Sequence, residues 1–181
     1  MKATQLLEQQ HRKVESLLNR VAKGGDDASS ALKELARDLA AHAAIEQDIF
    51  YPLVLEAKPD LINLSYEEHA LAELALKRLV ATHPREVTFV ARAEALRELV
   101  LAHVEHEEKE LFPAVQDAIG IDRLEAVGDQ LEKAYREALA EGFEALVGPS
   151  FAVTSADEAR KELAEAERPG AGAGAAVNPP R

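Results

Sequence analysis

The chain has 181 residues, of which 47% are hydrophobic and 4% aromatic, and none is cysteine. This length fits one compact domain with an appendage, and the lack of cysteine excludes disulfides, thiolate zinc sites, iron–sulfur clusters and a cysteine nucleophile. A formal net charge of −12 repels phosphate backbones, so we expect no nucleic-acid partner. The N-terminus turns polar at once and no apolar run reaches the roughly 20 residues that span a bilayer, which predicts a cytoplasmic protein without membrane contact.

The first 141 residues carry helical periodicity and many helix-forming residues, which predicts an all-α fold. Pro52 and Pro113 lie within two of the predicted helices and should kink them. Short connections between long amphipathic helices are typical of an up-down-up-down four-helix bundle. The predicted helices run from Thr4 to about Ala22, from a cap at Asp27 or Ser29 to about Ala57, from Asp60 to about Ala81, from about Arg85 to Ala118, and from Asp122 to about Glu141.

The composition changes after Gly142, which predicts a domain at residues 1–141 and an appendage at 142–181. Gly148-Pro149-Ser150 is typical of a linker. A capping box at Ser155–Glu158 predicts one short helix, Ala159–Glu167. The Gly/Ala/Pro-rich end is low in complexity and should be disordered.

A histidine motif occurs twice in the predicted bundle. In both copies a histidine is followed by a glutamate four residues on, an aromatic residue nine residues on and a proline ten residues on. The first copy is His42, Glu46, Tyr51 and Pro52, and the second is His103, Glu107, Phe112 and Pro113. The other two main helices carry one matching histidine each, His11 and His69. The sequence thus repeats a pair of helices, one with a lone histidine and one with His-x-x-x-Glu.

Histidine and glutamate four residues apart share one helix face, with Cβ atoms roughly 5–6 Å apart. Glu46 and Glu107 lie on the apolar stripe and have no cation four residues away, where a surface salt bridge would be formed. A buried, unpaired carboxylate is costly unless it coordinates a metal, and imidazole with carboxylate suits iron and other divalent first-row metals. We therefore interpret the two doublets as metal ligands, and the matched positions of His11 and His69 extend that interpretation to them.

This combination of motifs resembles the hemerythrin-like (HHE, cation-binding) domain family over about residues 4–141. The resemblance implies a non-haem di-iron centre with two iron ions and an oxo or hydroxo bridge. His11 and His42 would serve one iron, His69 and His103 the other, and both glutamates would bridge.

One position departs from the oxygen-carrying members of that family, which present a fifth histidine one turn after the third-helix histidine. Glu73 stands there in this chain. It is either an additional metal ligand or a surface ion-pair partner of Lys77, four residues on. His106 lies about 60° around the helix from His103, so we expect it behind the ligands or exposed, and His83 should be exposed in a turn.

The resemblance implies a protein that handles O2, NO or peroxide in a redox-sensing or detoxifying role, with a small diatomic molecule or peroxide as ligand. A reversible oxygen carrier or an iron-storage protein is an alternative, and a metal-free helical interaction module is an alternative of another class. A ferritin-like oxidase would need two Glu-x-x-His motifs, and only Glu8–His11 fits. Enzymatic activity and any protein partner stay open.

Overall fold

The computed structural model describes residues 1–56 and 58–147, and every regular element within them is helical, which confirms the all-α prediction for these residues. The predicted helix at Ala159–Glu167 and the low-complexity tail lie outside the described residues. The elements are α1 (Ala3–Lys23), α2 (Ala28–Ile45), η1 (Glu46–Phe50), η2 (Tyr51–Leu53), α3 (Pro59–Val80), α4 (Phe89–His106), η3 (Glu107–Leu111), α5 (Phe112–Ile119), α6 (Ile121–Glu141) and α7 (Phe143–Val147).

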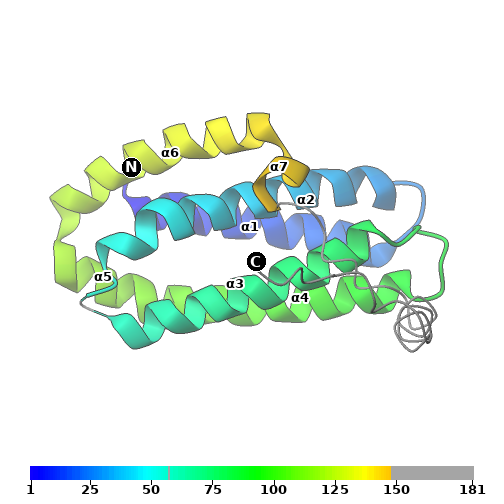
Figure 1. Ribbon diagram of the computed structural model, residues 1–181, viewed down its shortest axis with the longest axis horizontal. Coiled ribbons are helices and arrows are strands. Elements are labelled where there is room, and N and C mark those ends of the chain that lie inside the picture. The colour runs from blue at the N-terminus through cyan, green and yellow to red at the C-terminus, as the bar shows by residue number, and fades with distance from the viewer. Residues whose placement is uncertain (57, 148–181) are drawn as a thin grey trace, which may run out of the picture. The chain divides into compact units, whose positions relative to one another are not determined.

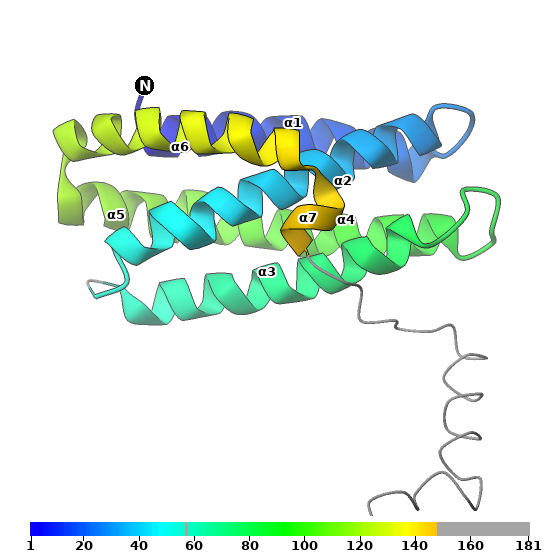
Figure 2. The ribbon, with the colours of Figure 1, turned by 45° about the horizontal axis from the view of Figure 1, so that its top comes forward.

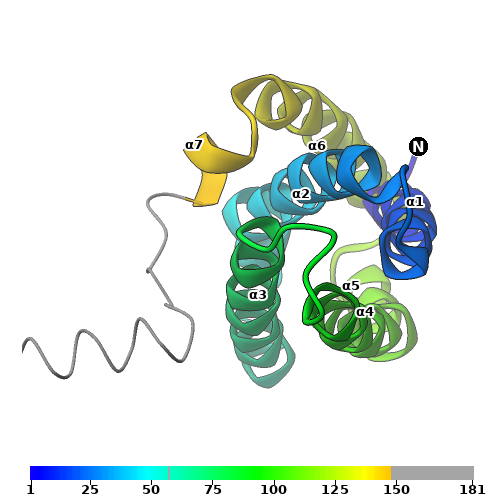
Figure 3. The same ribbon diagram turned by 90° about the vertical axis from the view of Figure 1, so that its right-hand side faces the viewer.

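Helices α1, α2, α3 and α4 lie side by side along their lengths around a common interior, as the view along the helices shows (Figures 1 and 3). Helix α6 packs outside α1 and α2, and α7 turns back against α2 (Figure 2). Leu124 and Leu131 of α6 are buried, and the Tyr135 hydroxyl donates a 2.7 Å hydrogen bond to the buried carboxylate of Asp38 on α2. Apolar burial and one polar bond thus fasten α6 to the main helices.

The second predicted helix leaves α-helical geometry after Ile45, and it does not continue to about Ala57. A π-helical turn (η1) and a short 3₁₀ turn (η2) follow, and regular helix ends at Leu53. The backbone N–H of Tyr51 donates to the carbonyl of Glu46, five residues earlier. The second motif makes the same π turn at η3, where Phe112 N–H donates to the Glu107 carbonyl, and the helix then continues as α5.

This wider turn has a consequence for the side chains. In a regular α-helix, residues five apart point about 140° away from each other. A π turn holds one extra residue, so Tyr51 returns to the interior face that Glu46 already occupies. Tyr51, Glu46 and Glu107 are all fully buried.

The interior consists of two apolar clusters with a polar layer between them. One cluster is almost entirely aliphatic and includes Val14, Leu35, Leu76 and Leu96. The other contains the aromatic residues Phe50, Tyr51 and Phe112 with their aliphatic neighbours. On each of the four main helical segments the residues of this polar layer lie near the point in the sequence where one cluster gives way to the other, so the apolar residues on either side hold the layer at one level. That layer comprises Gln10, His11, His42, Glu46, Ser65, His69, His103 and Glu107.

None of the helices in the described ranges combines the length and the hydropathy that a membrane crossing would require.

Candidate metal centre

The structure brings all six sequence-predicted ligands together in the polar layer, and each is at most 5% exposed. His42 Nε2 and His69 Nε2 lie 3.1 and 3.3 Å from Oε2 of Glu46. His11 Nε2 and His103 Nε2 lie 3.2 and 3.4 Å from Oε2 of Glu107. Each carboxylate therefore contacts one imidazole from each half of the repeat.

Donor atoms in this layer form two groups, each compact enough to hold one cation. One group contains His11, His42, Glu46 and Glu107. The other contains Glu46, His69 and His103. Because Glu46 belongs to both, the two donor groups share a carboxylate.

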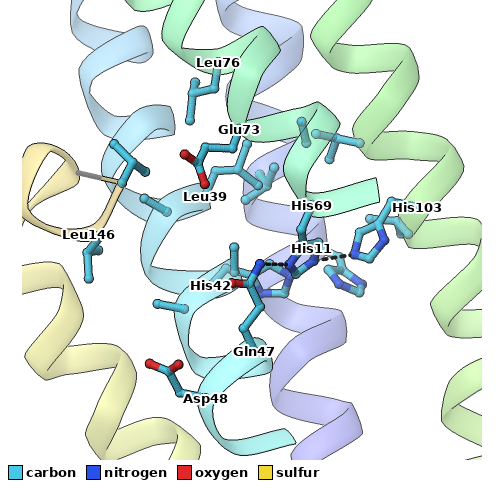
Figure 4. A pocket seen from close by; sticks show the side chains of 18 of the residues that line it. His11, Leu39, His42, Gln47, Asp48, His69, Glu73, Leu76, His103 and Leu146 are labelled. Carbon is cyan, nitrogen blue, oxygen red and sulfur yellow. Dashed lines mark hydrogen bonds between the residues drawn. The ribbon is translucent and has the colours of Figure 1, made fainter. Parts of the chain in front are cut away.

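The four imidazoles have the same orientation, with Nε2 facing the centre and Nδ1 held by a side chain from outside it. His11 and His103 donate from Nδ1 to the carboxylates of Glu108 and Glu68 at 2.9 and 2.8 Å. Nδ1 of His42 donates to Oε1 of Gln10 at 2.8 Å. The side-chain amide of Gln47 contacts Nδ1 of His69 at 2.9 Å (Figure 4). Rotation of that amide by 180° exchanges its nitrogen and oxygen, so that an acceptor faces Nδ1 instead of a donor. Partners of this kind fix the ring orientation and leave Nε2 free to bind a metal.

The sequence did not predict these four outer partners, yet their positions in the chain follow a simple rule. Gln10, Gln47, Glu68 and Glu108 are each adjacent in sequence to one of the six central residues. A neighbouring residue is rotated by about 100° on a helix, so it faces the adjacent helix while the central residue faces inward. Each partner then supports the imidazole of the next helix, in a closed ring from α1 to α2, α3, α4 and back to α1.

Tyr51 is a further residue of the centre that the sequence analysis did not assign. Its hydroxyl donates a 2.8 Å hydrogen bond to Oε1 of Glu107 and lies 3.1 Å from Nε2 of His69. Burial and the negative charges of Glu46 and Glu107 raise the pKa of Tyr51 well above its usual range, so the phenol keeps its proton. The spacing shared by the two copies of the motif puts an aromatic residue here, but only the π turn explains why its hydroxyl reaches the centre.

The buried carboxylates favour positive charge at the centre, although at His42 burial outweighs them and lowers the pKa. Burial opposes ionisation of Glu46, yet His42 and His69 hold the pKa of its carboxyl well below the usual range. Burial alone would lower the pKa of His103, but the neighbouring Glu107 and Glu68 carboxylates raise it to about 9. Two buried carboxylates thus stabilise cationic charge in a place from which water is largely excluded.

Three buried atoms at the centre test whether a metal fits these residues. Nε2 of His11, Oε1 of Glu46 and Oε2 of Glu107 have no hydrogen-bond partner among the described residues. A buried carboxylate oxygen without a donor costs roughly 1–3 kcal/mol or more. These unpaired atoms are imidazole nitrogen and carboxylate oxygen, which divalent first-row cations bind, so the residues fit a metal.

The remaining sequence-predicted residues lie outside the donor groups. Glu73 is 42% exposed and forms an ion pair with Lys77, and its carboxylate belongs to neither group. His106 lies behind His103, and both rings contact the same Glu68 oxygen, as expected for a residue behind the ligands. His83 is exposed in the turn before α4.

A cavity of about 250 Å³ adjoins the four imidazoles (Figure 4). Its other walls come from α1, α2, η1, α3, α4 and α7. The cavity gives a small molecule a route to the otherwise buried Nε2 atoms.

Comparisons with known proteins agree with this geometry. The chain is 26% identical over 129 residues to a DNA nickase of Nostoc sp., a match that covers 69% of this chain and 36% of that relative, so the chain spans about a third of the relative's length. A solved structure of a hemerythrin HHE cation binding domain-containing protein from Mycobacterium kansasii superposes with a TM-score of 0.68 at 24% identity, over 81% of this chain and 98% of that one, and shows that the fold is hemerythrin-like. The family model of the hemerythrin HHE cation binding domain matches residues 2–115, which is more than half of the chain. The chain belongs to the hemerythrin HHE cation-binding family.

Proposed function

We propose that the chain is a non-haem di-iron protein that handles O2, NO or peroxide in a redox-sensing or detoxifying role. The ligands would be His11, His42, Glu46, His69, His103 and Glu107, presented by an up-down-up-down four-helix bundle. The observation that carries the proposal is the set of unpaired carboxylate and imidazole atoms that converge in a buried layer. In a metal-free interaction module each of these two buried carboxylates would keep one oxygen without a hydrogen-bond donor, and that cost argues against such a module.

The metal, when bound, supplies reversible one-electron chemistry and an open coordination position for a small ligand. The chain's own residues prepare the site for it. Glu68, Glu108, Gln10 and Gln47 orient the imidazoles, and the two apolar clusters exclude bulk water. The protonated Tyr51 hydroxyl holds Oε1 of Glu107 in place.

Several features favour a reactive centre over a reversible oxygen carrier. The position of the fifth histidine of the carriers is occupied by Glu73, which pairs with Lys77. Four imidazoles and two carboxylates would therefore make up the ligand set, and a set with fewer neutral imidazoles beside its anionic carboxylates would stabilise the ferric state by charge neutralisation. The cavity beside the imidazoles gives O2 or peroxide access. The net charge of −12 argues against nucleic acid as a partner of this chain.

The metal content of the protein tests the proposal directly. Untagged protein should be loaded with ferrous iron under anaerobic conditions, desalted and measured for iron and zinc. We expect about two iron atoms per chain. His103→Ala should lose at least one of them, and His83→Ala, which removes an exposed histidine, should keep both. A metal-free or mononuclear wild-type protein would contradict the proposed centre.

The reaction with oxygen distinguishes the roles of such a centre. Reduced, loaded protein mixed with O2 should oxidise irreversibly, and peroxide consumption should be measured in parallel. A long-lived oxygenated form that releases O2 under vacuum, without peroxide turnover, would favour a carrier.

A further inference from the structure

The cavity beside the metal centre extends well beyond the imidazoles. Its far walls are aliphatic and include Leu39 of α2, Ala72 and Leu76 of α3, and Leu146 of α7. Figure 4 shows Leu39 and Leu76 set apart from the imidazole group, with Leu146 on the neighbouring α7. The cavity is therefore a chamber with a polar end at the centre and an apolar body that the metal ligands do not fill.

The size of the chamber exceeds the needs of a diatomic molecule or peroxide. Its volume is about 250 Å³. One water molecule needs about 10–15 Å³ on a comparable measure, and an engineered apolar cavity of about 150 Å³ in another protein binds benzene. A small oxygen species would leave most of the chamber empty or filled with poorly bonded water.

The charges around the chamber restrict the polar group that a ligand could carry. Gln47, Asp48 and Glu73 line it, and the lining contributed by the described residues contains no lysine or arginine. Asp48 is exposed and Glu73 is 42% exposed, so both carboxylates can meet a ligand at the open side. The Glu73 carboxylate is paired with the Lys77 ammonium, whereas Asp48 forms no ion pair with a described residue, so an anion entering at the open side would meet the uncompensated charge of Asp48, which is unfavourable.

We propose that this chamber binds a small apolar organic molecule, aromatic or branched aliphatic, whose polar group is neutral or cationic. The apolar part would contact Leu39, Ala72, Leu76 and Leu146, and the polar group would face the imidazoles or the carboxylates of Asp48 and Glu73. This inference goes beyond the proposed handling of O2, NO or peroxide. It is independent of the metal, because the aliphatic walls exist without one.

Three probes of similar size and different charge test the ligand class, namely indole, benzylamine and benzoate. Full-length protein, both metal-free and iron-loaded, should be titrated by calorimetry, with saturation-transfer NMR to detect weak binding. We expect indole and benzylamine to bind and benzoate to bind about tenfold more weakly or not at all. Binding to the metal-free protein separates this result from the fate of the di-iron proposal.

Two variants locate the probe within the chamber. Ala72→Leu adds volume to the chamber wall, and we expect it to weaken indole binding about tenfold or more. Ala70→Leu makes the same substitution at an exposed position of the same helix and should leave binding unchanged. Leu146→Ala removes part of the α7 wall without adding bulk, so it should also weaken binding even if Ala72→Leu folds poorly. Failure of all three probes to bind, a preference for benzoate over benzylamine, or unchanged affinity in both chamber variants would overturn the proposal.

Discussion

The two copies of the histidine motif build nearly the same structure but end in different aromatic residues. In the first copy Tyr51 lies against His69, with ring centroids 5.4 Å apart, and its hydroxyl enters the centre. In the second copy Phe112 stacks on His11 at 5.8 Å with an interplanar angle of 8° and offers no polar atom. Both follow a π turn that begins at the motif's glutamate.

This difference teaches that the repeat specifies where side chains lie, and that single atoms then make the two halves of the centre unequal. Both aromatic residues close the centre from the same side as the cluster around Phe50. Only the Tyr51 side adds a hydrogen-bond donor, which contacts Glu107 and His69. Glu107 belongs to the donor group of His11 and His42, and His69 belongs to the other group, so we expect the phenol to affect both groups.

Replacement of Tyr51 removes this asymmetry and should have the largest effect. Tyr51→Phe makes both copies end in phenylalanine and leaves Oε1 of Glu107 without its donor. A hydrogen bond to a charged group contributes roughly 1.5–3 kcal/mol, so metal-free protein should lose about that much unfolding free energy in urea.

Tyr66→Phe is the matched control, because the Tyr66 hydroxyl donates to a backbone carbonyl, that of Gln47, at 3.0 Å. It should cost only about 0.5–1.5 kcal/mol. Equal losses for the two variants would show that the Tyr51 bond to Glu107 has no special strength.

The outer partners sharpen the comparison, because each half of the repeat has one imidazole held by a carboxylate and one held by an amide. Glu68→Ala and Glu108→Ala should each lower iron affinity by about 10–100-fold, since removing such a partner frees the imidazole to rotate. Chelator competition measures the affinity. Glu105→Ala, which breaks an exposed pair with Lys109, is the control and should leave it unchanged. Wild-type affinity in both outer-partner variants would refute an orienting role.

The smallest effect is expected at Glu73, whose carboxylate belongs to neither donor group. Glu73→Ala should keep the iron content at the wild-type level and cost only about 0.2–0.5 kcal/mol in urea unfolding, the range of an i,i+4 ion pair. Lys77→Ala should also keep the iron content, but its side chain is only 9% exposed, so it should cost more because the packing of its aliphatic stem is lost as well. Loss of iron in Glu73→Ala, with retention in Lys77→Ala, would identify Glu73 as a ligand.

The sequence indicated which six side chains share the interior because that signal is local. His42 and Glu46 share a helix face by spacing alone, and so do His103 and Glu107. The residues found only in the structure depend on other features. The helix predicted to reach Ala57 ends at Leu53. This end was not predicted, because α-helical periodicity contains no sign of the π turn that precedes Pro52.

The appended segment gives a similar contrast. The change of composition after Gly142 marked the start of the appendage, yet Phe143 packs against the aliphatic cluster and α7 lines the chamber. Five residues are too few for periodicity to identify a packed helix. The domain boundary at residue 141 stays a prediction.

By itself, the sequence determined the helical class, the duplicated motif and the six inward residues, because spacing along one helix fixes which side chains share a face. The tertiary structure decided which helices are neighbours, and with that the pairing of Glu46 with His69, of Glu107 with His11, and of every outer partner with its imidazole. It also decided that the Tyr51 hydroxyl enters the centre and that α7 forms a wall of the chamber. These contacts join residues far apart in the chain. Their distances are set by the packing of one helix against another, and the periodicity of a single helix does not encode that packing.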